Sequence, residues 1–262
     1  MLTFKQIQDI YAFAEPQNKK TRLQLVEYIQ CELLDSLFKQ EGSELLNFMG
    51  GTAIRIVFGG NRFSEDLDFD NFGLSFVDFQ KLLEAVVSDM KIKGFETEFR
   101  FVEKNAFHCY IRFPKLLRSN ILSLHEDEKI LVRIDTTLKD EKIMPKIFLL
   151  EKFELYRNIR VNPVSIILSQ KLIAIKERKR EKGRDFYDVS FLYGLTNPDF
   201  GYIERMLGMD QEEFAQAIFD RCEQLNFKIL AKDVEPFLIK SDQIARVKTF
   251  PEFIRTKLEA GI

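Results

Sequence analysis

Three aspartates at alternate positions, Asp66, Asp68 and Asp70, are the densest group of potential metal ligands in the sequence. The apolar Leu67 and Phe69 alternate with them, which is typical of a strand with one face toward a core. Two positions along such a strand lie about 6.6 Å apart between α-carbons, so two carboxylates can share hard cations. Mg²⁺ prefers carboxylate oxygens and completes its shell with water and substrate phosphates. The run therefore predicts a magnesium-dependent phosphate chemistry.

A pair of glycines precedes this acidic strand. Gly50 and Gly51 follow the apolar run 45–49 and precede the segment 52–58, which predicts a tight turn from a strand into a helix. Without β-carbons, such a turn lets a phosphate approach backbone N–H groups and the positive end of a helix. A second glycine turn, at residues 59–60, leads to the acidic strand.

A further carboxylate lies in the middle of a later predicted strand, 129–138. Val132 and Ile134 share one face of that strand, and Arg133 and Asp135 share the other. A carboxylate among β-branched residues indicates a site that uses it. The alternative is an aspartate exposed to water on an edge strand.

A second group of charged residues follows more than thirty residues later, on two predicted helices. Lys171 and Arg178 lie near one another along one stripe of the first, and Asp185 and Asp188 are adjacent near the start of the second. A cation that meets triphosphate oxygens offsets the charge that develops in phosphoryl transfer. We assign this role to Lys171, with Arg178 or Arg184 assisting. The alternative is a solvated helix end.

Both groups match one family pattern. Gly50-Gly-Thr-Ala followed by Arg62-x-Ser64-x-Asp66-Leu-Asp68-Phe resembles the AbiEii/AbiGii toxin family of the DNA polymerase β-like nucleotidyltransferase superfamily. The block Lys171-x-x-Ala, then Arg178 and Arg184-Asp-x-x-Asp188, resembles the same family.

The resemblance implies roles for these residues. It places two Mg²⁺ ions on Asp66, Asp68 and Asp135, and makes Lys171, Asp185 and Asp188 part of the catalytic site, with the separate roles of the last two open. The residues expected to bind the NTP are Gly50, Gly51, Thr52, Arg62, Ser64, Lys171, Arg178 and Arg184.

The implied function is transfer of a nucleotide from an NTP to an acceptor. The resemblance points to RNA, with a tRNA 3′ end as one candidate, and to a toxin neutralised by a cognate antitoxin in abortive infection, a form of phage defence. One alternative is a protein or small-molecule acceptor such as an aminoglycoside. Another is a catalytically degenerate member that binds a partner, which the intact carboxylates disfavour.

Composition limits the remaining choices. The chain has 262 residues, 45% of them hydrophobic, and a formal net charge of −2, which argues against coating nucleic acid through overall charge but leaves room for a local basic groove. Its three cysteines are scattered, which disfavours a disulfide framework or zinc site and fits a cytoplasmic protein. No apolar leader or stretch of about 18 apolar residues is visible, so we expect no membrane span.

The order of predicted elements favours an α+β fold: a nucleotidyltransferase-type mixed sheet flanked by helices over residues 1–163, then a helical domain over 164–262, with Pro163 at the boundary. His108 and His125 are expected to be ordinary strand and loop residues. Helices are predicted at 3–14, 19–40, 75–93, 165–178, 184–192, 200–207, 211–225, 227–239 and 251–258, and further strands at 95–103, 107–113, 146–150 and 154–160.

Overall fold

The computed structural model describes residues 1–14, 20–104, 106–114 and 129–259. Their contacts divide the chain into two compact units, one comprising Met1–Gly59 and Phe63–Asn162 and the other comprising Gly60–Arg62 and Pro163–Ile262. The short segment Gly60–Arg62 therefore packs with the C-terminal helices, although it lies between two elements of the first unit. The described residues do not include His125, nor two residues whose types favour breaks between predicted elements: Pro16, typical of a helix end, and Asn105, typical of a turn between two strands.

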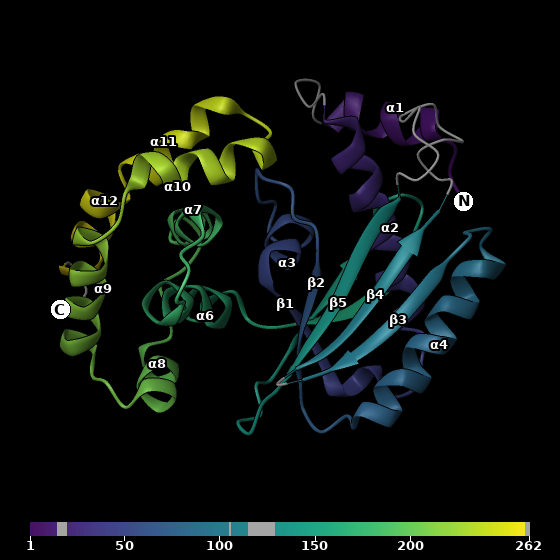
Figure 1. The fold of residues 1–262 in the computed structure, drawn as a ribbon, viewed down its shortest axis with the longest axis horizontal. Helices are drawn as coiled ribbons and strands as arrows, with labels where there is room; N and C mark the ends of the chain where they lie inside the picture. The colour runs from purple at the N-terminus through teal and green to yellow at the C-terminus, as the bar shows by residue number, and fades with distance from the viewer. Residues whose placement is uncertain (15–19, 105, 115–128, 260–262) are drawn as a thin grey trace. The chain divides into compact units, whose positions relative to one another are not determined.

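Strands of the first unit form a mixed sheet, which confirms the α+β fold expected from the sequence (Figure 1). Among the described residues the strand order is β3-β4-β5-β2-β1-β7-β6. β2 pairs antiparallel with β1 and parallel with β5, and β5 also pairs antiparallel with β4. The strands are β1 (Leu46–Met49), β2 (Leu67–Asn71), β3 (Glu98–Glu103), β4 (Phe107–Phe113), β5 (Ile130–Leu138), β6 (Lys146–Leu150) and β7 (Arg157–Val161).

One face of the β3–β4–β5 part of the sheet is covered by the helix α4 (Phe76–Ile92). Ser75 caps this helix by accepting a hydrogen bond from the Asp78 N–H, which is a role that serine commonly takes before a helix. On the covered side, the Phe79 ring lies 6.2 Å from that of Phe101 and 5.8 Å from that of Phe107, between ring centroids. Aromatic contacts of this kind account for part of the high phenylalanine content, because these rings fill the core.

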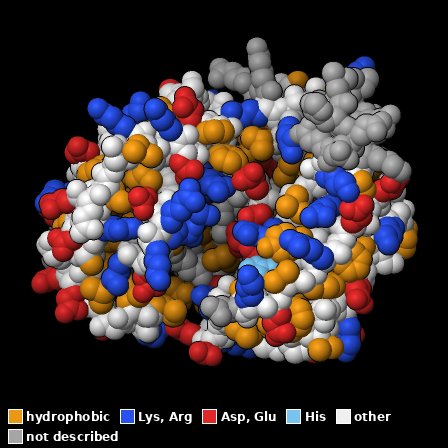
Figure 2. Space-filling view, viewed as in Figure 1, with side chains coloured by type: hydrophobic (Ala, Val, Ile, Leu, Met, Phe, Trp, Pro, Cys, Tyr) orange, Lys and Arg blue, Asp and Glu red, His pale blue; other side chains and the backbone are white. Residues whose placement is uncertain are grey.

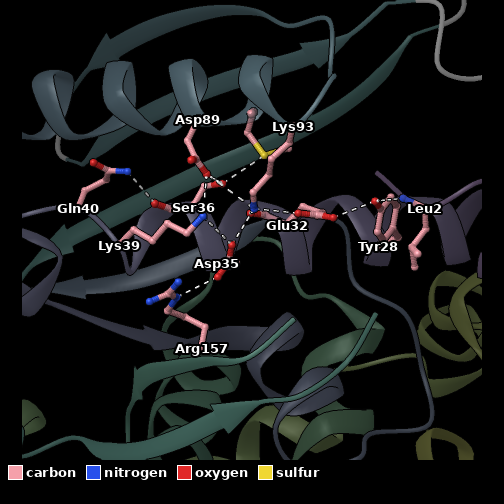
Figure 3. A network of polar contacts seen from close by, with 11 residues as sticks. Leu2, Tyr28, Glu32, Asp35, Ser36, Lys39, Gln40, Asp89, Lys93 and Arg157 are labelled. Atoms are coloured by element: carbon pink, nitrogen blue, oxygen red, sulfur yellow. Dashed lines mark hydrogen bonds and ion pairs between the residues drawn. The ribbon is translucent and has the colours of Figure 1, made fainter. Parts of the chain in front are cut away.

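The helix α2 (Thr21–Leu37) is buried over most of its length, including its polar positions. Figure 3 shows why this is tolerated: its acidic side chains lie in a network with Lys93 at the end of α4 and Arg157 of β7. Lys93 Nζ lies 2.8 Å from Glu32 Oε2 and 2.7 Å from Asp35 Oδ2, and Arg157 Nε lies 2.9 Å from Asp35 Oδ1. Each buried carboxylate thus has a cationic partner, which offsets the cost of removing it from water. The other described elements of this unit are the helices α1 (Phe4–Ala14) and α3 (Gly50–Ile56) and the short η1 (Ser43–Leu45).

The second unit is helical over its described residues. Its core includes an aromatic cluster in which the Phe186 ring lies 5.3 Å from that of Phe227 and 5.0 Å from that of Phe250. The helices are α6 (Val164–Glu177), α7 (Gly183–Leu192), α8 (Phe200–Leu207), α9 (Gln211–Glu223), α10 (Phe227–Val234), η2 (Glu235–Phe237), η3 (Ser241–Ile244), α11 (Ala245–Lys248) and α12 (Phe250–Glu259). None of the described helices in either unit is long and apolar enough to span a bilayer.

Several predicted boundaries differ from the observed ones for local reasons. β7 begins at Arg157 rather than at residue 154, because Phe153 and Glu154 have φ angles of 57° and 63°, which a strand does not allow. The helix predicted over 227–239 gives way to a 3₁₀ turn after Val234, because Pro236 lacks the N–H that an α-helix would use. Asp66 precedes β2, so it belongs to the lead-in segment and not to the strand itself.

Candidate active site

The turn between β1 and α3 positions the first carboxylate. Gly50 opens α3 with φ +78°, a left-handed conformation that strongly favours glycine. A β-carbon added there would lie 2.9 Å from Asp68 Cβ and closer still to the Asp68 carboxylate. Gly51 is buried, but it is not among the glycines with positive φ. Gly50 is therefore the glycine that this turn requires, because only a hydrogen leaves room for Asp68.

The lead-in to β2 is fixed by hydrogen bonds from two helices. Thr52 of α3 is fully buried, and its hydroxyl donates to the Asp66 carbonyl oxygen at 2.5 Å. Gln30 of α2 donates through Nε2 to the Ser64 carbonyl oxygen at 3.1 Å. The Thr52 side chain, which the family pattern assigns to nucleotide binding, is thus used here to hold the backbone that carries Asp66.

The carboxylates on β2 and β5 are cross-strand neighbours. Asp68 and Asp135 occupy paired positions in the parallel ladder of these two strands. Because β5 lies between β4 and β2, the interpretation of Asp135 as an edge-strand residue is wrong. Two residues separated by more than sixty positions in sequence are brought together by strand pairing alone.

Arg133 connects this pair to Asp66. Its Nη2 lies 2.7 Å from Asp66 Oδ2, and its Nε lies 2.8 Å from Asp135 Oδ2. Burial would lower the pKa of Arg133, but the carboxylates of Asp66 and Asp135 raise it above its usual value. A single guanidinium therefore offsets the mutual repulsion of carboxylates gathered in one place.

His108 is a member of this site that the sequence interpretation missed. It lies on β4 opposite Asp135, and its Nδ1 is 2.7 Å from Asp135 Oδ1. The expectation that it is an ordinary strand residue is therefore incomplete, because its ring contacts a candidate catalytic carboxylate. No signal in the sequence could have found it, since the contact depends on the register of β4 against β5.

Asp70, the last of the three alternating aspartates, differs from the other two because it is buried. It is 1% exposed, accepts a hydrogen bond from Asn162 Nδ2 at 2.7 Å, and lies 3.6 Å from Lys139 Nζ. These contacts tie β2 to the segments that follow β5 and β7. Asp70 therefore has a structural environment: it lies on the same side of β2 as Asp68, as the alternation predicts, but it is buried by other segments.

The donor types at this site fit a hard divalent cation. Asp66, Asp68 and Asp135 supply carboxylate oxygens, which are the ligands that Mg²⁺ prefers. Arg133 already supplies positive charge between two of them, as the contacts above show. Among the described residues, no three or more His, Cys, Asp or Glu side chains are arranged so that together they could hold a metal ion.

A second polar cluster lies within the helical unit. Lys171 of α6 has its Nζ 2.9 Å from Asp185 Oδ1 and 2.9 Å from Asp188 Oδ2, both on α7. Burial would lower the pKa of Lys171, but these two carboxylates raise it above its ordinary value. Burial likewise opposes ionisation of Asp185, yet Lys171 and Arg178 hold the pKa of Asp185 below its ordinary value. The two aspartates therefore hold the ammonium group of Lys171 in its charged form.

Arg62 belongs to this second cluster. Its Nε and Nη2 donate to the two carboxylate oxygens of Asp188 at 2.6 and 2.5 Å, and the side chain is 3% exposed. The prediction assigned Arg62 to nucleotide binding, but this guanidinium is buried and engaged with Asp188. Its observed position is that of a residue that fixes Asp188, which in turn contacts Lys171.

The other two predicted basic residues are less enclosed. Arg178 lies with Nε 3.4 Å from Asp185 Oδ2, and Arg184 places its guanidinium 4.7 Å from the centre of the Phe237 ring. Figure 2 shows Lys and Arg side chains gathered over α6 and α7, and acidic side chains over β2 and β5. The segment 176–184, where α6 ends and α7 begins, contains six lysines and arginines. Partly exposed cations of this kind can meet phosphate oxygens.

Comparison with known proteins yields one family and several related folds. No curated protein matches the sequence. The chain is similar in structure to JHP933 from Helicobacter pylori, with 18% identity, a TM-score of 0.56, and coverage of 92% of this chain and 94% of that one. It is also similar to MenT4, the nucleotidyltransferase toxin Rv2826c from Mycobacterium tuberculosis H37Rv, with 17% identity, a TM-score of 0.58, and coverage of 97% and 90%.

These likenesses show a shared fold across nearly the whole chain. The sequence also matches the family model described as "Nucleotidyl transferase AbiEii toxin, Type IV TA system" over residues 32–257, which includes both the carboxylates of the sheet and the Lys171 cluster. The chain is therefore a member of the AbiEii family, the nucleotidyltransferase toxins of type IV toxin–antitoxin systems.

Proposed function

We propose that this protein transfers a nucleotide from an NTP to RNA, and that Asp66, Asp68 and Asp135 are its catalytic carboxylates. The observation that carries the proposal is the pairing of Asp68 with Asp135 on adjacent parallel strands, with Asp66 joined to the pair through Arg133. Carboxylates this close are held together at an electrostatic cost, which a structural role alone does not explain.

In the proposed reaction an acceptor hydroxyl oxygen forms a bond to the α-phosphorus of the NTP. The bond from that phosphorus to the bridging oxygen breaks, pyrophosphate leaves, and the hydroxyl proton is released to solvent. Asp66, Asp68 and Asp135 would hold magnesium, which when bound polarises phosphate oxygens and lowers the pKa of the acceptor hydroxyl. Gly50 leaves room for the Asp68 carboxylate, and Thr52 fixes the backbone at Asp66.

We assign to Lys171 the neutralisation of charge on the triphosphate. The support is chemical: Asp185 and Asp188 keep the ammonium charged, and a charged donor in a partly dehydrated site makes a strong hydrogen bond to phosphate. Asp185 and Asp188 act in this proposal through Lys171 and not on the substrate. Arg178 and Arg184 are the more exposed cations that assist in binding the NTP.

For the acceptor we propose RNA, with a tRNA 3′ end as the first candidate, and for the biological role a cytoplasmic toxin held in check by a cognate antitoxin during phage infection. The family supplies the toxin–antitoxin context. The acceptor follows from the family resemblance of the motifs that carry Asp66, Asp68 and Lys171.

The test is to incubate purified protein with each α-labelled NTP, Mg²⁺, and either total RNA or total protein. Label in RNA that depends on Mg²⁺ and is lost in Asp68→Asn supports the proposal. Lys81→Gln, on the exposed side of α4, is the matched control and should label RNA normally. Label in protein alone, or in neither pool, would contradict the RNA acceptor or the enzymatic activity respectively.

A further inference from the structure

The open face of the β3–β4–β5 sheet continues directly from the candidate carboxylates. Three cross-strand rows point away from α4. The first contains Val102, His108 and Asp135, followed by Asp68. The next two rows are Arg100, Tyr110 and Arg133, then Glu98, Arg112 and Leu131. Four residues of strand separate the first row from the last, about 13 Å at the rise of a β-strand.

This face is exposed and carries planar cations. Arg100 and Arg112 are both exposed, and Leu131 of the last row is 46% exposed. The guanidinium of Arg100 lies over the Tyr110 ring, 4.7 Å from its centre. A guanidinium over an aromatic ring keeps N–H donors for phosphates, and both planar groups can stack on bases.

The part of this face that lies away from Asp68 and Asp135 carries a net positive charge. Arg133 is occupied by Asp66 and Asp135, and Glu98 lies 3.1 Å from Lys129 Nζ, which offsets its charge. Within the part of the chain that the structure describes, neither Arg100 nor Arg112 forms an ion pair with a carboxylate of this face, so both remain as cations that can attract a ligand. A polyanion is the ligand that this arrangement attracts.

We propose that this face binds a single-stranded segment of nucleic acid and leads its reactive end to Asp135 and Asp68. Arg100 and Arg112 contact phosphates, and the Arg100–Tyr110 pair offers a stacking surface for a base. The inference rests on the proposed function, because it locates where the RNA acceptor of that function would lie. Nucleic acid is favoured over an acidic protein because the face combines an arginine over an aromatic ring with a second cation, Arg112, on the adjacent strand.

The experiment measures the affinity of a short fluorescent single-stranded RNA by anisotropy, without NTP, for Arg100→Gln/Arg112→Gln. Each lost phosphate contact lowers the salt slope of log K by about 0.7 for a single strand. The double variant should therefore bind about 25-fold more weakly than wild type near 0.1 M salt, and about threefold more weakly near 0.5 M.

The matched control is Lys81→Gln/Lys91→Gln, which removes the same charge from α4 on the other side of the sheet. It should change neither the affinity nor the salt slope by more than a small factor. Equal effects of the two double variants would overturn the inference, because the loss would then reflect net charge. Displacement of the RNA by poly-glutamate at equal charge concentration would also overturn it.

Transfer assays with the same variants separate this inference from the proposed function. If wild type labels RNA and Arg100→Gln/Arg112→Gln labels it equally well at subsaturating RNA, the face is not the acceptor site. If wild type labels no RNA but binds it with the predicted dependence on Arg100 and Arg112, the RNA acceptor is wrong and the binding face stands.

Discussion

Replacing Gly50 by alanine tests how the turn before α3 positions Asp68. Two effects are expected to act together at this position. Gly50 has φ +78°, a conformation that costs an L-residue about 1–2 kcal/mol. In addition, the new methyl group would approach Asp68 Cβ to 2.9 Å and its carboxylate more closely, and overpacking of this kind typically costs about 1–3 kcal/mol.

A second glycine separates the two effects. Gly94, which ends α4, has φ +94°, and a β-carbon added there would meet nothing within 4 Å. Gly94→Ala should therefore lose only the conformational term, about 1–2 kcal/mol of unfolding free energy. Gly50→Ala should lose about 2–5 kcal/mol, the sum of the conformational and overpacking terms.

The activity of the two variants should differ more than their stability. Displacing Asp68 by about 1 Å can lower the transfer rate by roughly a hundredfold. Gly94 is far from the carboxylates in sequence and has no proposed role in the reaction, so Gly94→Ala should transfer label at the normal rate. Urea unfolding at neutral pH gives the free energies, and label transfer from the preferred NTP gives the rates. Equal stabilities, or a normal transfer rate in Gly50→Ala, would refute the assignment of Gly50 as the residue that makes room for Asp68.

Three further outcomes are expected. Asp68→Ala should lower nucleotide transfer at least about a hundredfold while the protein stays folded by circular dichroism, and a wild-type rate would rule out its catalytic role. Lys171→Ala should weaken transfer and also destabilise the fold by about 1–3 kcal/mol, because Asp188 and Asp185 lose one cationic partner but keep Arg62 and Arg178. Lys171→Arg should restore part of both losses, as urea unfolding and transfer rates will test. Burial would raise the pKa of Asp35, but Lys93 and Arg157 hold it below its ordinary value. The contribution of Asp35 to the free energy of unfolding is therefore present above the ordinary carboxyl pKa of about 4, and it is lost as the pH falls through the lowered pKa. Asp35→Asn should thus lower the unfolding free energy at neutral pH and flatten its decline in acid, and an unchanged pH profile would contradict the network in Figure 3.

Local sequence patterns were sufficient for most elements of the fold. The strand predicted over 107–113 and the helix predicted over 200–207 match the observed limits, because each depends on residues within one element. The expected limits fail where the local backbone departs from the pattern. At Phe153 and Glu154 positive φ angles delay β7, and apolar periodicity carries no information on such angles.

The sequence by itself also determined the residue types of the candidate site. Glycines before a short helix, carboxylates on a strand, and a lysine followed by two spaced aspartates are local features, and through their resemblance to the AbiEii/AbiGii pattern they indicate nucleotidyltransferase chemistry. Alternation alone, however, assigns Asp66, Asp68 and Asp70 to one row, whereas Asp70 is buried against Asn162. The face on which a strand residue lies does not say whether another element covers it.

Only the tertiary structure decided the partners of these residues. The contact of His108 with Asp135 depends on the register of β4 against β5, and the pairing of Asp68 with Asp135 depends on β2 lying beside β5. Arg62 lies four residues before Asp66 in sequence, yet it is buried against Asp188, 126 residues away. The physical reason is that periodicity describes the faces of one element, whereas strand register and buried ion pairs are set by the packing of the whole unit.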